Sequence, residues 1–200
     1  VFTNWGNYFT LNWDAPVTNK DAVIDAVGQT LEIRPGPIDW TITNSLRIGN
    51  SASGKASLAL YGNGTLAVTN SSGTATLYVN WGTAGSGHLF SWGPTALNIV
   101  ADHLYTTNVF GSAGLGSIND GTLTTRGESI FAGTGPFYLG RFGKDVTWNI
   151  LGGTNTVKGD FRIGAQGLTA GLTGTGTVNV IGPTAVLWAN AGAYCGGYSS

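Results

Sequence analysis

The sequence predicts an all-β protein, a single-domain parallel β-helix (β-solenoid) with three short strands in each coil. Segments of alternating hydrophobic and polar residues recur along nearly the whole chain, and Gly, Asn, Ser and Thr separate them. One four-residue motif recurs in similar form as Leu46-Arg47-Ile48-Gly49, Phe137-Tyr138-Leu139-Gly140 and Phe161-Arg162-Ile163-Gly164. Degenerate repetition of this kind is typical of solenoids.

Helix signals are nearly absent from the chain. Residues 19–27 predict either a short helix that stops at Gly28 or a strand over Ala22-Val23-Ile24. The other predicted elements are short strands that recur about every ten residues, as in sandwiches and solenoids. They are 31–33, 40–43, 46–48, 57–60, 66–69, 77–80, 89–91, 97–100, 104–106, 122–125, 130–132, 137–139, 147–150, 156–158, 161–163, 178–181 and 186–188.

The spacing between Gly140 and Gly164 predicts the length of one coil. Three strands fit between the two glycines, which indicates a three-sided coil of about 24 residues, repeated about six or seven times. Gly and Asn suit its corners, where φ is positive, and Asn50, Asn70 and Asn80 are predicted to stack as amide ladders. Alternation then predicts the inward residues to be Leu58, Leu60, Leu66, Val68, Leu77, Val79, Val178 and Val180, and the outward ones to include Ala67, Tyr78 and Asn179.

Residues 1–40 differ from the rest in their aromatic and acidic content. They contain Trp5, Tyr8, Phe9 and Trp13, together with five of the ten acidic residues. A solenoid must cover its first open edge, so this segment predicts an N-terminal cap. The alternative is an aromatic platform for sugars. The body is then 41–190, with Gly-rich loops at 81–95, 108–120 and 166–176, and residues 191–200 form a C-terminal tail.

Composition excludes several classes of partner. Charged residues make up 10% of the chain and the net charge is −1, so there is no basic field for nucleic acid or an anionic membrane. No 18-residue apolar run predicts a transmembrane span. The chain contains no Met, so Val1 is not a translation start; we expect either an exported chain whose leader was removed or a fragment. Cys195 is a single cysteine, so it either pairs between chains or remains a free thiol.

The sequence predicts no catalytic residue, cofactor or metal site. The two histidines lack neighbouring ligands at metal-binding spacing. One charged cluster stands out, which in a polysaccharide lyase would supply a base and neutralise a substrate carboxylate, and otherwise forms surface ion pairs. Its members are Arg141, Lys144, Asp145, Lys158, Asp160 and Arg162.

A resemblance to known proteins begins at the N-terminus. Asn4-Trp5-Gly6, Asn12-Trp13-Asp14 and Gly28-Gln29-Thr30-Leu31-Glu32-Ile33 are similar to the opening of secreted bacterial repeat proteins. These are the autotransporter-associated β-strand repeat and PEP-CTERM-type surface proteins, whose repeat body the later phrases at 46–49 and 176–180 resemble. The resemblance implies export, a right-handed parallel β-helix and a structural or adhesive role at the cell surface.

We therefore expect a secreted, extracellular or cell-surface structural protein without enzymatic activity. Open strand edges and a nearly uncharged surface favour end-to-end assembly into a homo-oligomer or homopolymer. The alternatives are a carbohydrate-binding or adhesive module, with sugars stacking on Trp81, Trp92, Tyr105 and Trp148 unless Trp148 is core, and a polysaccharide lyase or hydrolase. The predicted assembly interface comprises Trp5, Tyr8, Phe9, Trp13, Val186, Trp188, Tyr194, Cys195 and Tyr198.

Overall fold

The computed structural model describes the protein as an all-β chain. Backbone and side chains are described for residues 40–48, 64–79, 98–106, 121–133, 137–140, 145–164 and 174–195. The backbone alone is described for strand residues 3–5, 8–10, 22–24, 29–33, 38–39, 56–60, 88–91, 97, 141 and 165. Every element within this described part is a β-strand.

The strands form four sheets, which we call A to D. Sheet A contains β1 (Thr3–Trp5), β2 (Tyr8–Thr10), β4 (Gln29–Ile33), β7 (Ala56–Leu60) and β10 (His88–Ser91). Sheet B contains β3 (Ala22–Ile24), β6 (Ser45–Ile48), β9 (Thr76–Val79), β12 (His103–Thr106), β14 (Ser129–Phe131), β17 (Thr154–Val157) and β20 (Val186–Ala189). Sheet C contains β5 (Ile38–Ile42), β8 (Gly64–Val68), β11 (Leu97–Ala101), β13 (Gly121–Thr125), β16 (Asp145–Ile150) and β19 (Thr175–Val180). Sheet D contains β15 (Phe137–Arg141), β18 (Asp160–Ala165) and β21 (Gly192–Cys195).

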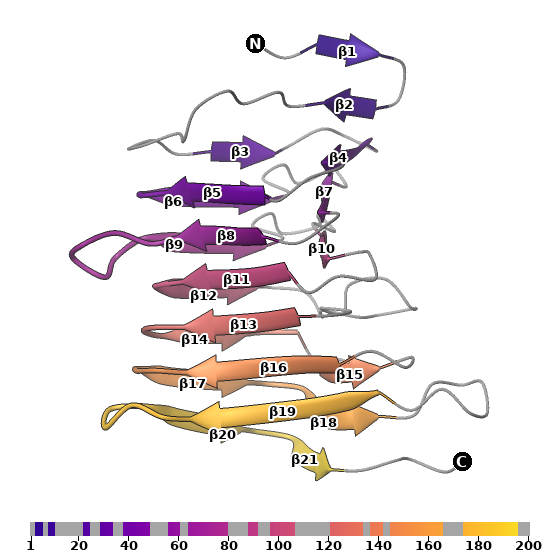
Figure 1. Cartoon of the computed structure of the whole chain (residues 1–200). Helices are drawn as coiled ribbons and strands as arrows, with labels where there is room; N and C mark the ends of the chain where they lie inside the picture. Colours follow the sequence, from indigo (N-terminus) through magenta and orange to yellow (C-terminus); the bar gives the residue numbers. More distant parts are fainter. Residues whose placement is uncertain are drawn as a thin grey trace.

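The chain passes through these sheets in a fixed order. From β5 onward each strand of sheet C is followed by a strand of sheet B, and the next pass adds one strand to each sheet in the same direction. Figure 1 shows these passes as successive layers from the N-terminal to the C-terminal end. Among the pairings of the described strands, only β1 with β2 is antiparallel. The sheets are therefore mostly parallel, and each ends in an open edge strand.

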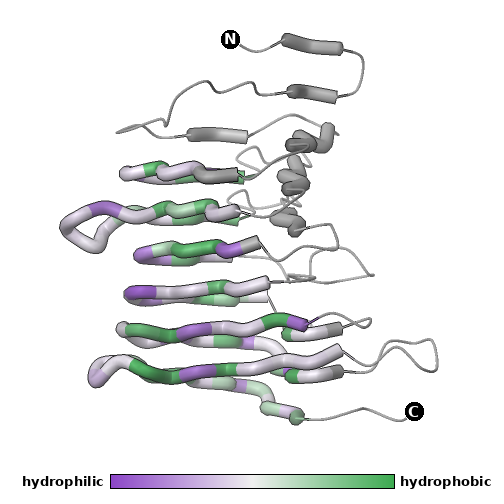
Figure 2. The backbone as a smooth tube through the Cα atoms, in the orientation of Figure 1, coloured by the Kyte–Doolittle hydropathy of each residue, from purple (hydrophilic) through white to green (hydrophobic). Residues whose placement is uncertain are grey.

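The core consists of like residues stacked from layer to layer. In sheet C, Leu66, Ile99, Leu123 and Trp148 are in register on successive strands, and all four are buried. Figure 2 shows hydrophobic and hydrophilic segments alternating along the strands, as inward and outward side chains require. Sheet D contributes Phe161, whose ring meets Trp148 edge-on at 6.0 Å. Burial of these columns is the main favourable term holding the sheets together.

One inward column of sheet B changes from apolar to polar. Leu104 is followed in register by Ser129 and then by Asn155, and both polar side chains are buried. The Asn155 carboxamide oxygen accepts hydrogen bonds from the hydroxyls of Ser129 and Thr125, and Thr125 in turn accepts one from the Trp148 indole N–H. The Asn155 amide donates to backbone carbonyls of the neighbouring corner. Because each of these buried polar groups has a hydrogen-bond partner, the column favours one packing arrangement of the core over others.

Several sequence predictions are confirmed by these strands. Each of the predicted strands overlaps an observed one. Gly140 and Gly164 both have positive φ, at +73° and +65°. Tyr138 pairs with Arg162, 24 residues later, but Gly64 pairs with Leu97, 33 residues later, so the predicted spacing holds only for part of the chain. Residues 22–24 form β3, so the strand alternative is confirmed for this segment and the helix is wrong.

Other predictions need correction. Val180 was expected to point inward, but it is 51% exposed because β19 is the last strand in the order of sheet C. Asn70 was expected in an amide ladder, but its side chain bonds the carbonyl of Thr43 and the hydroxyl of Thr74. Asn50 and Asn80 lie outside the described residues. Within the predicted tail, residues 192–195 form β21, which pairs with β18.

Candidate functional site

The C-terminal layer forms an open edge, which we call the β19–β21 edge. β19, β20 and β21 are the outermost strands of sheets C, B and D, and Figure 1 shows them together at the C-terminal end. Among the described residues, six large hydrophobic side chains are exposed, and five of them lie in or beside these strands. They are Val180, Ile181, Val186, Trp188 and Tyr194, and the sixth is Leu151.

The edge also presents backbone hydrogen-bonding groups. The N–H groups of Ile181, Val186 and Asn190 point back to the preceding layer, where they donate to carbonyls of residues 150, 153 and 157. Because these groups alternate in direction along a parallel strand, those of the residues between point outward from the edge. In β19 and β20, the backbone groups that point outward belong to Gly176, Val178, Val180, Leu187 and Ala189. Such a row of groups is a template for pairing with a further strand.

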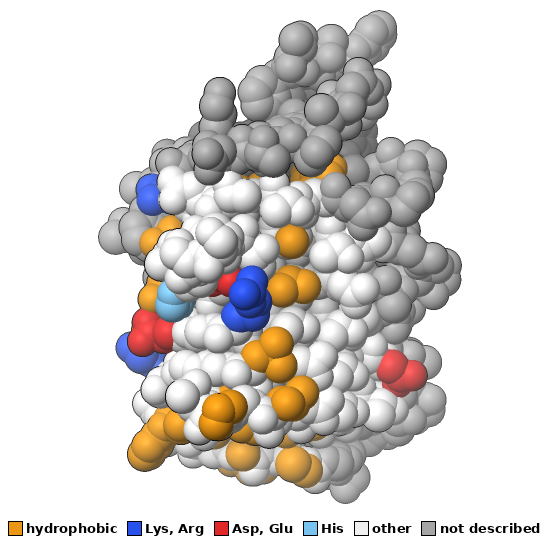
Figure 3. Space-filling model, turned by 60° about the vertical axis from the view of Figure 1, so that its left-hand side comes forward, with side chains coloured by type: hydrophobic (Ala, Val, Ile, Leu, Met, Phe, Trp, Pro, Cys, Tyr) orange, Lys and Arg blue, Asp and Glu red, His pale blue; other side chains and the backbone are white. Residues whose placement is uncertain are grey.

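No charge protects this edge. The last charged residue in the sequence is Arg162, so residues 163–200 contain neither Lys, Arg, Asp nor Glu. Figure 3 shows hydrophobic side chains gathered toward the C-terminal end of this face, with the charged side chains elsewhere on it. Proteins that keep their edge strands apart usually place Lys, Pro or a bulge there. The absence of charge leaves the β19–β21 edge open to association.

The predicted interface residues fall partly on this edge. Val186, Trp188, Tyr194 and Cys195 are all exposed there. Sequence reasoning missed Val180, which it expected to point inward, and Ile181, which it placed at the end of the same strand. The uncharged run from residue 163 onward was the signal that could have found them.

The N-terminal part of the predicted interface is placed only by its backbone. Asn4 pairs with Phe9, and Trp5 pairs with Tyr8, in the antiparallel β1–β2 ladder. The side chains of these residues, and all of Trp13 and Tyr198, lie outside the described residues.

An aromatic row runs along the outer face of sheet B. Arg47, Tyr78 and Tyr105 are in register on β6, β9 and β12. The Arg47 guanidinium carbon lies 5.1 Å from the Tyr78 ring centre, and the two tyrosine rings stack at 5.6 Å. Both faces of Tyr78 are therefore covered by protein. This packing supports the sheet and leaves the rings poorly placed as a platform for sugars.

The hydroxyl of Tyr105 is also engaged. It donates a 2.6 Å hydrogen bond to Glu128. Burial, this hydrogen bond and the negative charge of Glu128 raise the pKa of Tyr105 to about 12. Of the other aromatic residues proposed for sugar stacking, Trp148 is fully buried in the core, and Trp81 and Trp92 lie outside the described residues.

The predicted charged cluster is divided between two sheets. On sheet D, Arg162 pairs with Asp160 at 3.0 Å and stacks between the rings of Tyr138 and Tyr194. On sheet C, the carboxylate of Asp145 accepts a hydrogen bond from the backbone N–H of Thr175. Lys158 is exposed, and the side chains of Arg141 and Lys144 lie outside the described residues. Asp145, Asp160 and Arg162 therefore serve as structural contacts.

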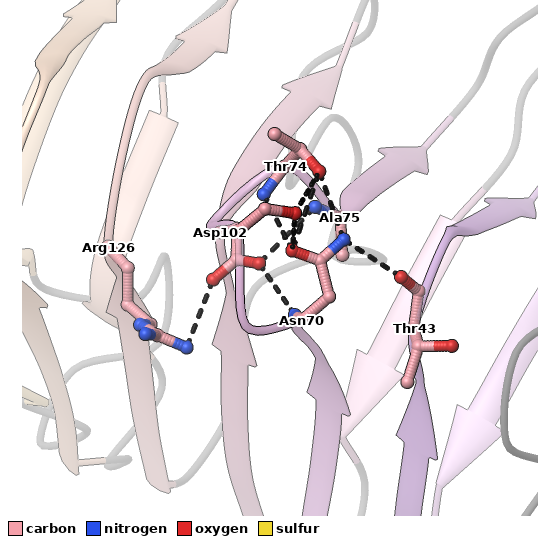
Figure 4. Close-up of polar contacts among 7 residues, drawn as sticks. Thr43, Asn70, Thr74, Ala75, Asp102 and Arg126 are labelled. Atoms are coloured by element: carbon pink, nitrogen blue, oxygen red, sulfur yellow. Dashed lines mark hydrogen bonds and ion pairs between the residues drawn. The ribbon is translucent and has the colours of Figure 1, made fainter.

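The corner at residues 69–75 between sheets C and B is built around a buried carboxylate (Figure 4). Asp102 is the single residue between β11 and β12, and it is fully buried. One carboxylate oxygen accepts the backbone N–H groups of Asn70 and Ala75, and the other lies 3.1 Å from the Arg126 guanidinium. Asp102 thus ties the longer corner at residues 69–75, in the layer before it, to Arg126 in the layer after it.

Comparisons with known proteins add no family to these observations. No family model, curated protein or solved structure matches the chain. Within the described residues, no three side chains of His, Cys, Asp or Glu are grouped to hold a metal ion. That same part of the chain contains no helix that could cross a membrane.

Proposed function

We propose that this protein is a secreted, non-enzymatic structural subunit that assembles end to end with copies of itself at the cell surface or in an extracellular layer. Its body is a right-handed parallel β-solenoid with three strands in each coil. The observation that carries the proposal is the β19–β21 edge, which combines outward-pointing backbone groups with exposed apolar side chains and no charge.

The order of the strands supports the solenoid. The last two passes of the chain run through sheets C, B and D in the same sequence, as β16–β17–β18 and then β19–β20–β21. Each strand of the second pass pairs in parallel with its counterpart in the first. The right-handed sense and the export follow from the resemblance to secreted bacterial repeat proteins.

A structural role is supported by the contacts that polar and aromatic side chains make within the molecule. Several described charged residues are held in corner and outer-face contacts, in particular Asp102 with Arg126 and Asp160 with Arg162. Tyr78 and Tyr105 of sheet B stack on each other, and Tyr138 of sheet D packs on Arg162. Among the described residues, most of the exposed large hydrophobic side chains lie at the β19–β21 edge.

The test compares two lysine substitutions by sedimentation velocity over a range of concentrations, with negative-stain microscopy of the same samples. We expect the parent chain to associate with rising concentration. Val180→Lys places a charge on the edge and should weaken association at least about tenfold, since contact would desolvate the charge or oppose it to a like charge. Leu151→Lys is the matched control, because Leu151 is an exposed residue one layer away from the edge, and it should leave association unchanged.

Strictly monodisperse monomers of the parent chain at every concentration would overturn the proposal. So would a Val180→Lys variant that associates as strongly as the parent chain.

A further inference from the structure

We propose that two copies meet tail to tail about a two-fold axis, with β19 pairing antiparallel to β19 of the partner subunit. The inference rests on the proposed self-association and on the three-sided coil, and it specifies the geometry of the contact. A two-fold axis perpendicular to the stack brings the two β19–β21 edges face to face. Viewed along the stack, the chain of the rotated copy follows its coil in the opposite direction. The strands that meet are therefore antiparallel.

Strand lengths select the position of the axis. β19 has six residues, whereas β20 and β21 have four each. With the axis across the middle of β19, this strand pairs with its own copy, and β20 pairs with β21 of the partner subunit, so that all lengths match. With the axis across β20 or β21, a six-residue strand would meet a four-residue strand and leave backbone groups unpaired, which is costly at a contact.

The side chains along β19 fit an axis through Val178. The outward-pointing backbone groups belong to Gly176, Val178 and Val180. An axis at Val178 pairs it with Val178 of the partner subunit and sets Val180 opposite Gly176 of the partner subunit. Val180, which is 51% exposed, then faces a residue without a side chain. The same uncharged edge on both copies brings no like charges together.

In a head-to-tail contact, the strands of the N-terminal end would not match those of the β19–β21 edge. At the N-terminal end the outermost strands of sheets A, B and C are β1, β3 and β5. β1 runs antiparallel to its neighbour β2, whereas β3 and β5 run parallel to theirs. The N-terminal end therefore does not offer three parallel strands that would continue the C-terminal layer.

Self-cross-linking of single cysteines distinguishes the two arrangements. In a Cys195→Ser background, Val178→Cys brings two copies of one residue together only if the contact is two-fold. The Cα atoms of a hydrogen-bonded antiparallel pair lie about 5.5 Å apart, within the range that a disulfide spans. We expect a covalent dimer on non-reducing gels after mild oxidation, with the 178–178 cross-link identified by peptide mass spectrometry. Thr147→Cys, one layer inside the edge, is the control and should remain monomeric on the gel.

A second pair of variants tests the contact without altering the inward face. Thr177 and Asn179 are both exposed, and each would lie opposite the other across the axis. A mixture of Thr177→Cys and Asn179→Cys chains should cross-link, and either variant alone should cross-link at least about tenfold less, because like residues lie farther apart.

The outcomes separate this inference from the proposed function. Association that persists while neither the Val178→Cys chain nor the mixture cross-links overturns the two-fold contact and leaves self-assembly standing. Cross-linking of Thr147→Cys to the same extent as Val178→Cys also overturns it, because the contact would then not be specific to the edge. Parent chains that remain monomers at every concentration overturn both proposals.

Discussion

At the scale of single residues, Asp102 has the largest structural consequence among the described charged side chains. It is fully buried, and its carboxylate joins three segments that belong to different layers. We predict that Asp102→Asn lowers the free energy of unfolding by about 2–3 kcal/mol, because an amide nitrogen must then face an N–H group or a guanidinium. Urea denaturation measures this loss.

The control for this prediction is an ion pair of similar length at the surface. Asp160 lies 3.0 Å from Arg162, but both side chains are partly exposed. Asp160→Asn should cost at most about 1 kcal/mol, as exposed ion pairs usually do. An Asp102→Asn protein as stable as the Asp160→Asn protein would contradict the role assigned to the corner.

The role of Asp102 could not be predicted from the sequence. It stands alone between two strands, and nothing in its neighbours indicates that it serves a corner more than twenty residues earlier. That corner, residues 69–75, varies in length from the other corners of the same column, so register could not be counted across it. The side-chain amide of Asn70, expected in a ladder of amides, instead donates to the carbonyl of Thr43 in the preceding layer and to the hydroxyl of Thr74 in its own corner.

At the scale of strands and corners, the sequence predicted much more. Inward alternation identified Leu66, Val68, Leu77 and Val79, all of which are buried. Such positions are predictable because a strand buried on one face imposes a period of two on its own sequence. The burial of Asn155 could not be predicted in this way. Its hydrogen-bond partners Ser129 and Thr125 lie on other strands, and the sequence around Asn155 does not indicate them.

At two corner glycines, the cost of a positive φ can be measured separately from the cost of a steric clash. Gly153 and Gly73 have nearly the same φ, at +67° and +70°. A Cβ at Gly153 would lie 2.4 Å from a backbone carbon of Gly127 in the next layer, whereas a Cβ at Gly73 would meet nothing within 4 Å. We predict that Gly73→Ala costs about 1–2 kcal/mol from φ alone. Gly153→Ala should cost a further 1–3 kcal/mol or so, because the layers must move apart.

Thermal or urea unfolding of the two variants measures this difference. Equal losses of stability at Gly73 and Gly153 would mean that the layers are not held at the spacing described here. Far-ultraviolet circular dichroism of both variants confirms that the strand content is retained before the comparison is made.

At the scale of the whole molecule, the distribution of charge determines how copies associate. The chain carries a net charge of −1, and its last charged residue is Arg162. Association through the β19–β21 edge therefore depends on apolar burial and backbone hydrogen bonds, neither of which is screened by ordinary salt. We predict that the association constant changes less than about threefold between roughly 0.05 and 0.5 M sodium chloride, a range over which the Debye length falls severalfold.

Sulfate provides the complementary measurement, because it strengthens apolar burial by exclusion from the protein surface. At equal ionic strength, sodium sulfate should tighten association where sodium chloride does not, as measured by sedimentation velocity. A steep fall with sodium chloride would instead assign the contact to charged residues, which the described structure places outside the β19–β21 edge. The same measurement on Val180→Lys should show association becoming stronger with sodium chloride, since screening reduces the repulsion between the two introduced charges. That reversal of salt dependence by one substitution would place the contact at this edge.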